Sequence, residues 1–137
     1  MRKRKRKLVD PLQYQMSIQA EDLSGYVPAF GWEAAPASKK QTERLEKLGI
    51  FGDELCAGMA QKLLEKLDAR RYAGLSTPKQ IRFLEGRGFL HVGTWSFEAA
   101  RNMIDRIAAN GWVTPRGIEA ANYSPTNEPH PDISFEI

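Results

Sequence analysis

Hydrophobic positions follow a helical period through the middle of this chain, and the same pattern occurs twice. Residues 38–50 have the sequence SKKQTERLEKLGI, and residues 77–89 have the sequence TPKQIRFLEGRGF. At an offset of 39 positions these segments share Lys, Gln, Leu, Glu and Gly, and residues 60–67 match residues 100–107 at an offset of 40. A repeat of about 40 residues predicts two similar units, each of which buries the same face.

Both copies carry the start and stop signals of two helices. Each begins with a Ser or Thr three residues before a Gln, which is typical of a capping box, and a glycine follows the first helix. The boxes are Ser38 with Gln41 and Thr77 with Gln80, and the glycines are Gly49 and Gly88. Stripes of apolar residues then predict a second helix over residues 54–72 and over residues 96–110.

This element order predicts an all-α fold of two tandem helix-loop-helix hairpins, over residues 38–76 and 77–112. The expected core is formed by the apolar stripes of the four helices. Its predicted members are Leu45, Leu48, Leu63, Leu64, Leu67, Phe83, Leu84, Met103, Ile104 and Ile107.

The segment before the repeat predicts a short N-terminal helix. Asp10 followed by Pro11 is typical of an N-cap and a first helical residue. The helix is expected to end near residue 25, with Leu12, Met16 and Leu23 along one face.

Prolines and glycines mark the segments on either side of the repeat. Residues 26–37 are expected to form an ordered linker, whose Phe30 and Trp32 pack on the body of the domain. We therefore group residues 10–37 as a short helix and aromatic linker. Residues 113–137 contain four prolines and no clear period, which predicts coil at the C-terminus.

The charge of the chain is concentrated in a tail. The net charge of +3 and the pI of about 9.1 come from six consecutive cations at residues 2–7. Without them the chain has 14 Lys+Arg against 17 Asp+Glu, and residues 8–117 are nearly neutral at +1. A basic tail over residues 1–9 binds polyanions without reading their sequence. The alternative is a solvated terminus or a boundary within a longer protein.

Composition excludes several classes of protein. A chain of 137 residues suits one modest domain and is too short for a motor. The single cysteine, Cys56, excludes an internal disulfide and a cysteine-rich zinc site, which favours a reducing, cytoplasmic setting. No apolar run reaches the ~18 residues of a membrane span, and no signal-peptide core follows the basic tail, so no membrane partner is expected.

Catalytic and cofactor signals are missing from the sequence. It has no glycine-rich loop ending in Lys and Ser or Thr, so no nucleotide phosphate site is expected. The two histidines, His91 and His130, stand far apart without ligand-like partners, which argues against a metal site. Cys56 has no histidine near it in sequence to activate a thiolate. We therefore expect a protein that is not an enzyme and carries no cofactor.

Cations at helix starts and turns form the candidate site for nucleic acid. Helix N-termini with nearby cations bind phosphates. The candidates are Lys79, Arg82, Arg87 and Arg101 in the second copy, and Lys39 and Lys40 in the first. The alternative is that these side chains form the solvated face of amphipathic helices.

Tryptophans supply one further candidate. Trp95 lies in a loop beside cations, where an indole can stack on a base. The alternative is that Trp95 caps a small core. Trp112 follows a glycine at a helix end and is expected in the core.

Several blocks of the chain resemble a known family. Residues 77–85, 88–89, 91–96 and 107–112 look like the extreme C-terminal region of DEAD/DEAH-box-type helicases from phages and gut bacteria. Residues 4–12, 20–23 and 30–33 are similar to the stretch that joins this region to the motor, so that the resemblance covers roughly residues 2–123. It implies a nucleic-acid-remodelling context, with the motor motifs upstream and helicase motor domains as partners.

Each hairpin is also similar in pattern to SAP and helix-extended-loop-helix modules, which bind DNA. Those modules are usually single, whereas here two are fused with a tryptophan-containing loop. The resulting hypothesis is a non-catalytic, nucleic-acid-binding accessory domain of a helicase-type protein, with DNA favoured over RNA. The alternative is a protein-interaction or structural module, such as a motor-docking segment or a phage-encoded adaptor or inhibitor. That alternative predicts an exposed apolar patch instead of a cation cluster.

Overall fold

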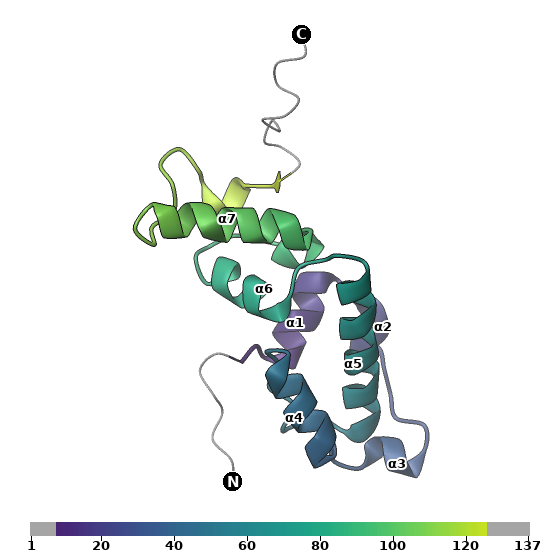
Figure 1. The fold of residues 1–137 in the computed structure, drawn as a ribbon. Helices are drawn as coiled ribbons and strands as arrows, with labels where there is room; N and C mark the ends of the chain where they lie inside the picture. Colours follow the sequence, from purple (N-terminus) through teal and green to yellow (C-terminus); the bar gives the residue numbers. More distant parts are fainter. Residues whose placement is uncertain (1–7, 126–137) are drawn as a thin grey trace.

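The computed structural model describes residues 8–125, and every regular element within that range is helical (Figure 1). The prediction of an all-α fold is confirmed for these residues. The six tail cations, His130 and the last part of the predicted C-terminal coil lie outside the described residues.

Two helix pairs follow the repeat. Helix α4 (Lys39–Lys47) packs on α5 (Ala57–Tyr72), and α6 (Pro78–Glu85) packs on α7 (Phe97–Ala109). Both predicted capping boxes form, because the Ser38 and Thr77 hydroxyls accept from the third residue of their helices. Helix α5 begins three residues later than predicted.

The first helices of the two copies end in the same way. Gly49 and Gly88 both have a φ of +97°, a conformation that favours glycine. The following residue then turns back to the helix, since Ile50 N donates to Leu45 O at 2.9 Å and its counterpart Phe89 N donates to Leu84 O at 3.2 Å. Glycine stops of this kind are a common way to satisfy the last carbonyls of a helix.

The ends of each loop are joined by equivalent short bridges. In the first copy Ala37 N donates to Leu55 O at 2.9 Å. In the second copy Ser76 N donates to Trp95 O at 3.0 Å. These bonds tie the start of each first helix to the start of each second helix.

Helix α1 (Pro11–Ile18) begins as predicted but packs through a different face. The Asp10 carboxylate accepts from the second and third residues of the helix. The helix ends early because Gln19 has a φ of +58°, and α2 (Glu21–Ser24) follows as a separate turn. The predicted apolar face was wrong for Leu12 and Met16, which are 60% and 69% exposed, whereas its third member, Leu23, is buried in α2.

The buried face of α1 is largely polar, and it is formed by Pro11, Tyr14, Gln15 and Ser17. The Ser17 hydroxyl donates to Glu85 Oε2 at 2.5 Å and accepts from Gly93 N at 3.0 Å. A side chain at Gly93 would place a Cβ 2.4 Å from the Ser17 carbonyl oxygen, so the two backbones touch. Helix α1 is therefore fixed to the loop of the second hairpin (Figure 1).

The residue before α1 is attached to the other hairpin. Val9 N donates to Gly49 O at 2.7 Å, and Phe51 N donates to Val9 O at 2.9 Å. Residues 8–18 thus contact both copies of the repeat, and the chain enters the domain at the turn of the first hairpin.

Arg70, near the end of α5, forms a second link between the copies. Its side chain is buried, and Nη2 donates to Ser76 O at 3.1 Å, to Ser76 Oγ at 3.2 Å and to Gly93 O at 2.8 Å. Ser76 Oγ in turn donates to Val92 O at 2.7 Å. A buried guanidinium is tolerated only where such acceptors replace water.

The core is continuous through both hairpins. Of the predicted members, Leu48, Phe83 and Ile104 are only partly buried, and the others are buried. The pattern missed core residues that lie in loops and in α1. These are Tyr14, Ile50, Phe89, Val92 and Trp95.

The linker over residues 26–37 contains the short helix α3 (Gly31–Ala34). The prediction that Phe30 and Trp32 attach it was wrong, since they are 66% and 55% exposed. Instead the Tyr26 hydroxyl donates to the Glu33 carboxylate, and the pair lies against α5 at Gly58.

The segment after α7 is partly anchored. A short 3-10 turn, η2 (Ala120–Asn122), precedes Tyr123, whose ring packs edge-on against Phe89 at 5.7 Å and Trp95 at 5.4 Å. The predicted coil therefore contributes one aromatic side chain to the second hairpin.

Candidate functional site

Trp95 is not available for base stacking. Its side chain is 4% exposed, and its ring meets Phe89 edge-on at 5.7 Å and Tyr123 at 5.4 Å. The base-stacking hypothesis for Trp95 was therefore wrong, and the alternative that Trp95 caps a small core is confirmed, because the loop that carries it folds into the core. The prediction for Trp112 was also wrong, since this residue is 56% exposed.

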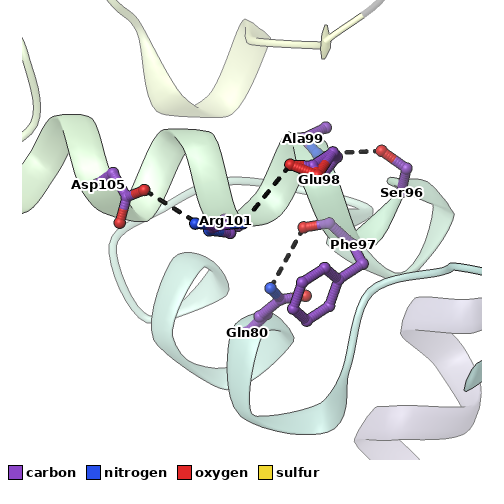
Figure 2. Close-up of polar contacts among 7 residues, drawn as sticks. All are labelled: Gln80, Ser96, Phe97, Glu98, Ala99, Arg101 and Asp105. Atoms are coloured by element: carbon purple, nitrogen blue, oxygen red, sulfur yellow. Dashed lines mark hydrogen bonds and ion pairs between the residues drawn. The ribbon is translucent and has the colours of Figure 1, made fainter.

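Arg101 lies between two carboxylates of its own helix. Its guanidinium is 3.8 Å from Glu98 Oε1 and 3.9 Å from Asp105 Oδ2 (Figure 2). These acids lower the positive potential that a phosphate would meet at Arg101. We therefore leave Arg101 out of the site. The same view shows Gln80 Nε2 donating to Phe97 O at 3.3 Å, which joins α6 to the start of α7 (Figure 2).

Lys39 and Lys40 are exposed at the start of α4. Lys39 Nζ is 4.0 Å from the Glu43 carboxylate one turn later. The rise of an α-helix places both lysines about 10 Å from the other end of α4. They are thus separated from the cations of the second copy.

The two hairpins meet at a cavity of about 200 Å³. It lies where α4 and α5 end and α6 begins, and Lys79 alone among the predicted site residues lines it. Its lining comprises Tyr14, Lys47, Leu48, Leu67, Asp68, Arg70, Arg71, Leu75, Ser76, Thr77, Pro78 and Lys79. We call it the junction cavity.

Three exposed cations converge on the junction cavity. Lys47, Arg71 and Lys79 line it, and within residues 8–125 none of the three makes an ion pair. The one acid in the lining, Asp68, is held by Arg44 at 3.1 Å. The Lys79 stem packs on the turn of the first hairpin, since a Cβ on Gly49 would lie 3.1 Å from Lys79 Cγ.

Arg82 and Arg87 line a second, larger depression of about 570 Å³ toward the C-terminal end of α6. Leu8 and Val9 form part of its lining, so the six cations of residues 2–7 precede this place directly in sequence. Asp10 and Glu85 also line it, which tempers its positive charge. We call it the entry groove.

Buried polar atoms lie beneath the junction cavity. Burial raises the pKa of the Tyr14 hydroxyl above its ordinary value, and the positive charge of Arg70 partly offsets the rise. Tyr14 is therefore a neutral phenol at physiological pH. In the described part of the chain, Tyr14 Oη and Arg70 Nε are buried without a hydrogen-bond partner.

Other chemistry is sparse in residues 8–125. No group of three or more His, Cys, Asp and Glu side chains is placed to hold a metal ion there. Within the same residues, no helix has the length and apolarity to cross a bilayer. Cys56 is half-buried at the start of α5, where its side chain makes no capping hydrogen bond.

Sequence reasoning missed Lys47 and Arg71 as partners of Lys79. Each stands in the last turn of its helix, which is also where a cation favourably meets the helix dipole. Nothing in the pattern distinguishes that ordinary role from a binding role. Only the meeting of the two hairpins brings the three side chains to one place.

In comparisons with known proteins, no family model, no curated protein and no solved structure matches the chain.

Proposed function

We propose that this domain binds nucleic acid without catalysing a reaction on it. The observation that carries the proposal is the convergence of Lys47, Arg71 and Lys79 on the junction cavity, where no carboxylate of residues 8–125 is paired to them. Cations that are not paired within the protein are the ones that release counterions from a phosphate backbone. Arg82 and Arg87 extend this positive surface along α6 to the entry groove.

The way in which residues 8 and 9 attach to the folded domain supports the same binding surface. Val9 is held by Gly49 and Phe51, and Leu8 lines the entry groove beside Arg82. The cations of residues 2–7 directly precede Leu8 in the sequence. A context within a helicase-type protein, as an accessory domain of its motor, rests on the sequence resemblance and is part of the proposal.

The test uses fluorescence anisotropy with labelled DNA and RNA oligonucleotides over a series of salt concentrations. In the full chain the six tail cations are replaced by glutamine, so that only the folded part contributes. We expect measurable binding whose affinity falls with salt. The pair Lys47→Gln/Lys79→Gln should reduce the slope of log K against log salt by about two.

The matched control removes the same charge elsewhere. Lys62 lies over the Tyr26 ring at 5.2 Å, and Lys66 is 3.1 Å from Asp22, so both are already engaged. The pair Lys62→Gln/Lys66→Gln should leave the slope nearly unchanged. Binding lost equally in both pairs, or absent from the tail-neutral chain, would contradict the proposal.

One observation favours the second candidate, a protein-docking module. Val27, Phe30 and Trp32 are exposed within six residues of each other, on the linker that covers the first hairpin. Exposed apolar side chains that gather in this way are typical of interaction sites. If Phe30→Ala/Trp32→Ala left the affinity for nucleic acid unchanged, a protein partner at the linker would bind a surface separate from the nucleic-acid site.

A further inference from the structure

Trp112 occupies an unusual position for a large aromatic residue. It is 56% exposed and has a φ of +66°, in the left-handed region that bulky side chains rarely adopt. The conformation is held by Trp112 N, which donates to Ile107 O at 2.8 Å. Glycine would adopt this backbone conformation without strain, whereas tryptophan does not. The stability of the fold therefore does not explain why an indole occupies position 112.

The indole belongs to a small group that includes a cation. Its ring meets Phe83 edge-on, with centroids 6.1 Å apart and planes at 75°. The Arg87 guanidinium lies over the same Phe83 ring, 4.5 Å from its centroid. Within residues 8–125, Arg87 Nε is buried without a hydrogen-bond partner, and none of the ion pairs there involves Arg87.

Phe83 connects this group to the phosphate surface. Phe83 and Arg87 both line the entry groove, together with Arg82 and the root of the basic tail. An exposed aromatic ring beside a cationic groove is the arrangement with which proteins hold single strands, because bases stack on the ring while phosphates follow the cations.

We infer that Trp112 stacks on an unpaired base, so that the ligand of the proposed site is a single-stranded nucleic acid. The inference rests on the proposed function and narrows its ligand. A duplex keeps its bases stacked on one another and offers none to the indole. The single strand binds with its phosphates on Arg82 and Arg87 and one base on Trp112.

The experiment compares three labelled probes of equal length: an oligothymidylate, the same strand with abasic sites, and a duplex. The protein is the full chain with the tail cations replaced by glutamine. Trp112→Gly suits the local φ and removes the ring. We expect Trp112→Gly to lower the affinity for the oligothymidylate by about tenfold, while the affinities for the abasic strand and the duplex stay the same.

Trp32→Ala is the matched control, because Trp32 is 55% exposed and lies on the linker. It should leave all three affinities unchanged. The melting temperature of Trp112→Gly should equal or exceed that of the parent, which separates loss of a contact from loss of the fold. An oligoribouridylate of the same length shows whether DNA or RNA supplies the base.

A second readout is tryptophan fluorescence. Stacking should quench the indole emission of the Trp32→Phe chain and leave the Trp112→Phe chain unquenched. Equal affinity for the oligothymidylate in Trp112→Gly and in the parent would overturn the inference while leaving the proposed function intact. Absence of binding to every probe would instead overturn the proposed function.

Discussion

The two hairpins have equivalent backbone hydrogen bonds, but different segments of the chain pack on them. At equivalent places in their second helices, α5 has Gly58 and α7 has Glu98. A Cβ on Gly58 would lie 2.0 Å from the Tyr26 hydroxyl, so the absence of a side chain lets the linker rest on the first hairpin. Glu98 is exposed and pairs with Arg101, and none of residues 8–125 covers it as the linker covers Gly58. The comparison teaches that the absence of one side chain allows a flanking segment to pack on one copy of the repeat and not at the equivalent place in the other.

The cores of the two copies also differ. Ile50 in the first copy corresponds to Phe89 in the second, and Leu55 corresponds to Trp95. The larger rings of the second copy reach outward to Tyr123 after α7. The second hairpin is thus completed by a later segment, and the first by an earlier one.

The largest expected effect concerns Arg70 and its counterpart Asn110. Arg70→Ala removes three buried hydrogen bonds and leaves the carbonyls of Ser76 and Gly93 without a donor. We expect a loss of about 3 kcal/mol in the free energy of unfolding, measured by urea denaturation. Asn110 is exposed and donates to Val113 O at 3.0 Å, so Asn110→Ala should cost about 1 kcal/mol or less.

Equal losses in these two variants would show that the copies are joined by other contacts. A thermal transition that splits into two steps in Arg70→Ala would show that Arg70 couples the hairpins cooperatively.

A smaller effect is expected from Gly58→Ala, with Glu98→Ala as its counterpart. The added methyl group would collide with Tyr26 and with the Glu33 Cβ at 2.8 Å, which costs about 2 kcal/mol of overpacking. Alanine returns about 1 kcal/mol of helix propensity, so the net loss is about 1 kcal/mol. Glu98→Ala on the exposed side of α7 should change stability by no more than about 0.5 kcal/mol. A Gly58→Ala chain as stable as the parent would mean that the linker is not held at this point.

The smallest effect is a pH dependence that belongs to the first hairpin. The hydrogen bond to Glu33 raises the pKa of Tyr26 from 10.0 to about 12 and lowers that of Glu33 below its ordinary 4.5. Between pH 10 and 12 the folded state keeps a proton that the unfolded state has released, so stability falls as pH rises through this window. Below pH 4.5 the Glu33 contribution is lost as pH falls.

Phenolate absorbance measures this difference directly. Tyr26→Phe should remove the step of the alkaline titration near pH 12, and Glu33→Gln should move that step toward pH 10. Tyr72, which is exposed at the end of α5, provides the comparison, because Tyr72→Phe should leave the step in place. A titration unaffected by Glu33→Gln would contradict the assigned cause.

Local signals predicted the parts of this fold that local chemistry decides. The capping boxes at Ser38 and Thr77 and the stops at Gly49 and Gly88 need only neighbouring residues, and all four formed as expected. Local signals did not show that Trp95 is buried and Trp112 is exposed. The burial of a side chain depends on contacts between segments that are far apart in the sequence.

Helix α1 shows the same limit from the polar side. Its buried face uses Gln15 and Ser17, and a hydropathy pattern cannot show that Glu85 and Gly93 supply matching partners. The candidate site has the same origin. The sequence identified Lys79 as a cation at the start of a helix. Lys47 and Arg71 line the same cavity only because the two hairpins pack against each other.

The repeat offset changes from 39 to 40 between residues 50 and 55, so the loop of the second hairpin is one residue longer. That loop forms the 3-10 turn η1 (Val92–Thr94), with His91 at a φ of +56° before it, and presents Gly93 to α1. At an offset of 40 the first loop has Asp53, whose Cβ would not fit so near the Ser17 carbonyl. The longer loop with its glycine therefore removes an ambiguity that an exact duplication would carry, because α1 can pack closely on only one of the two loops.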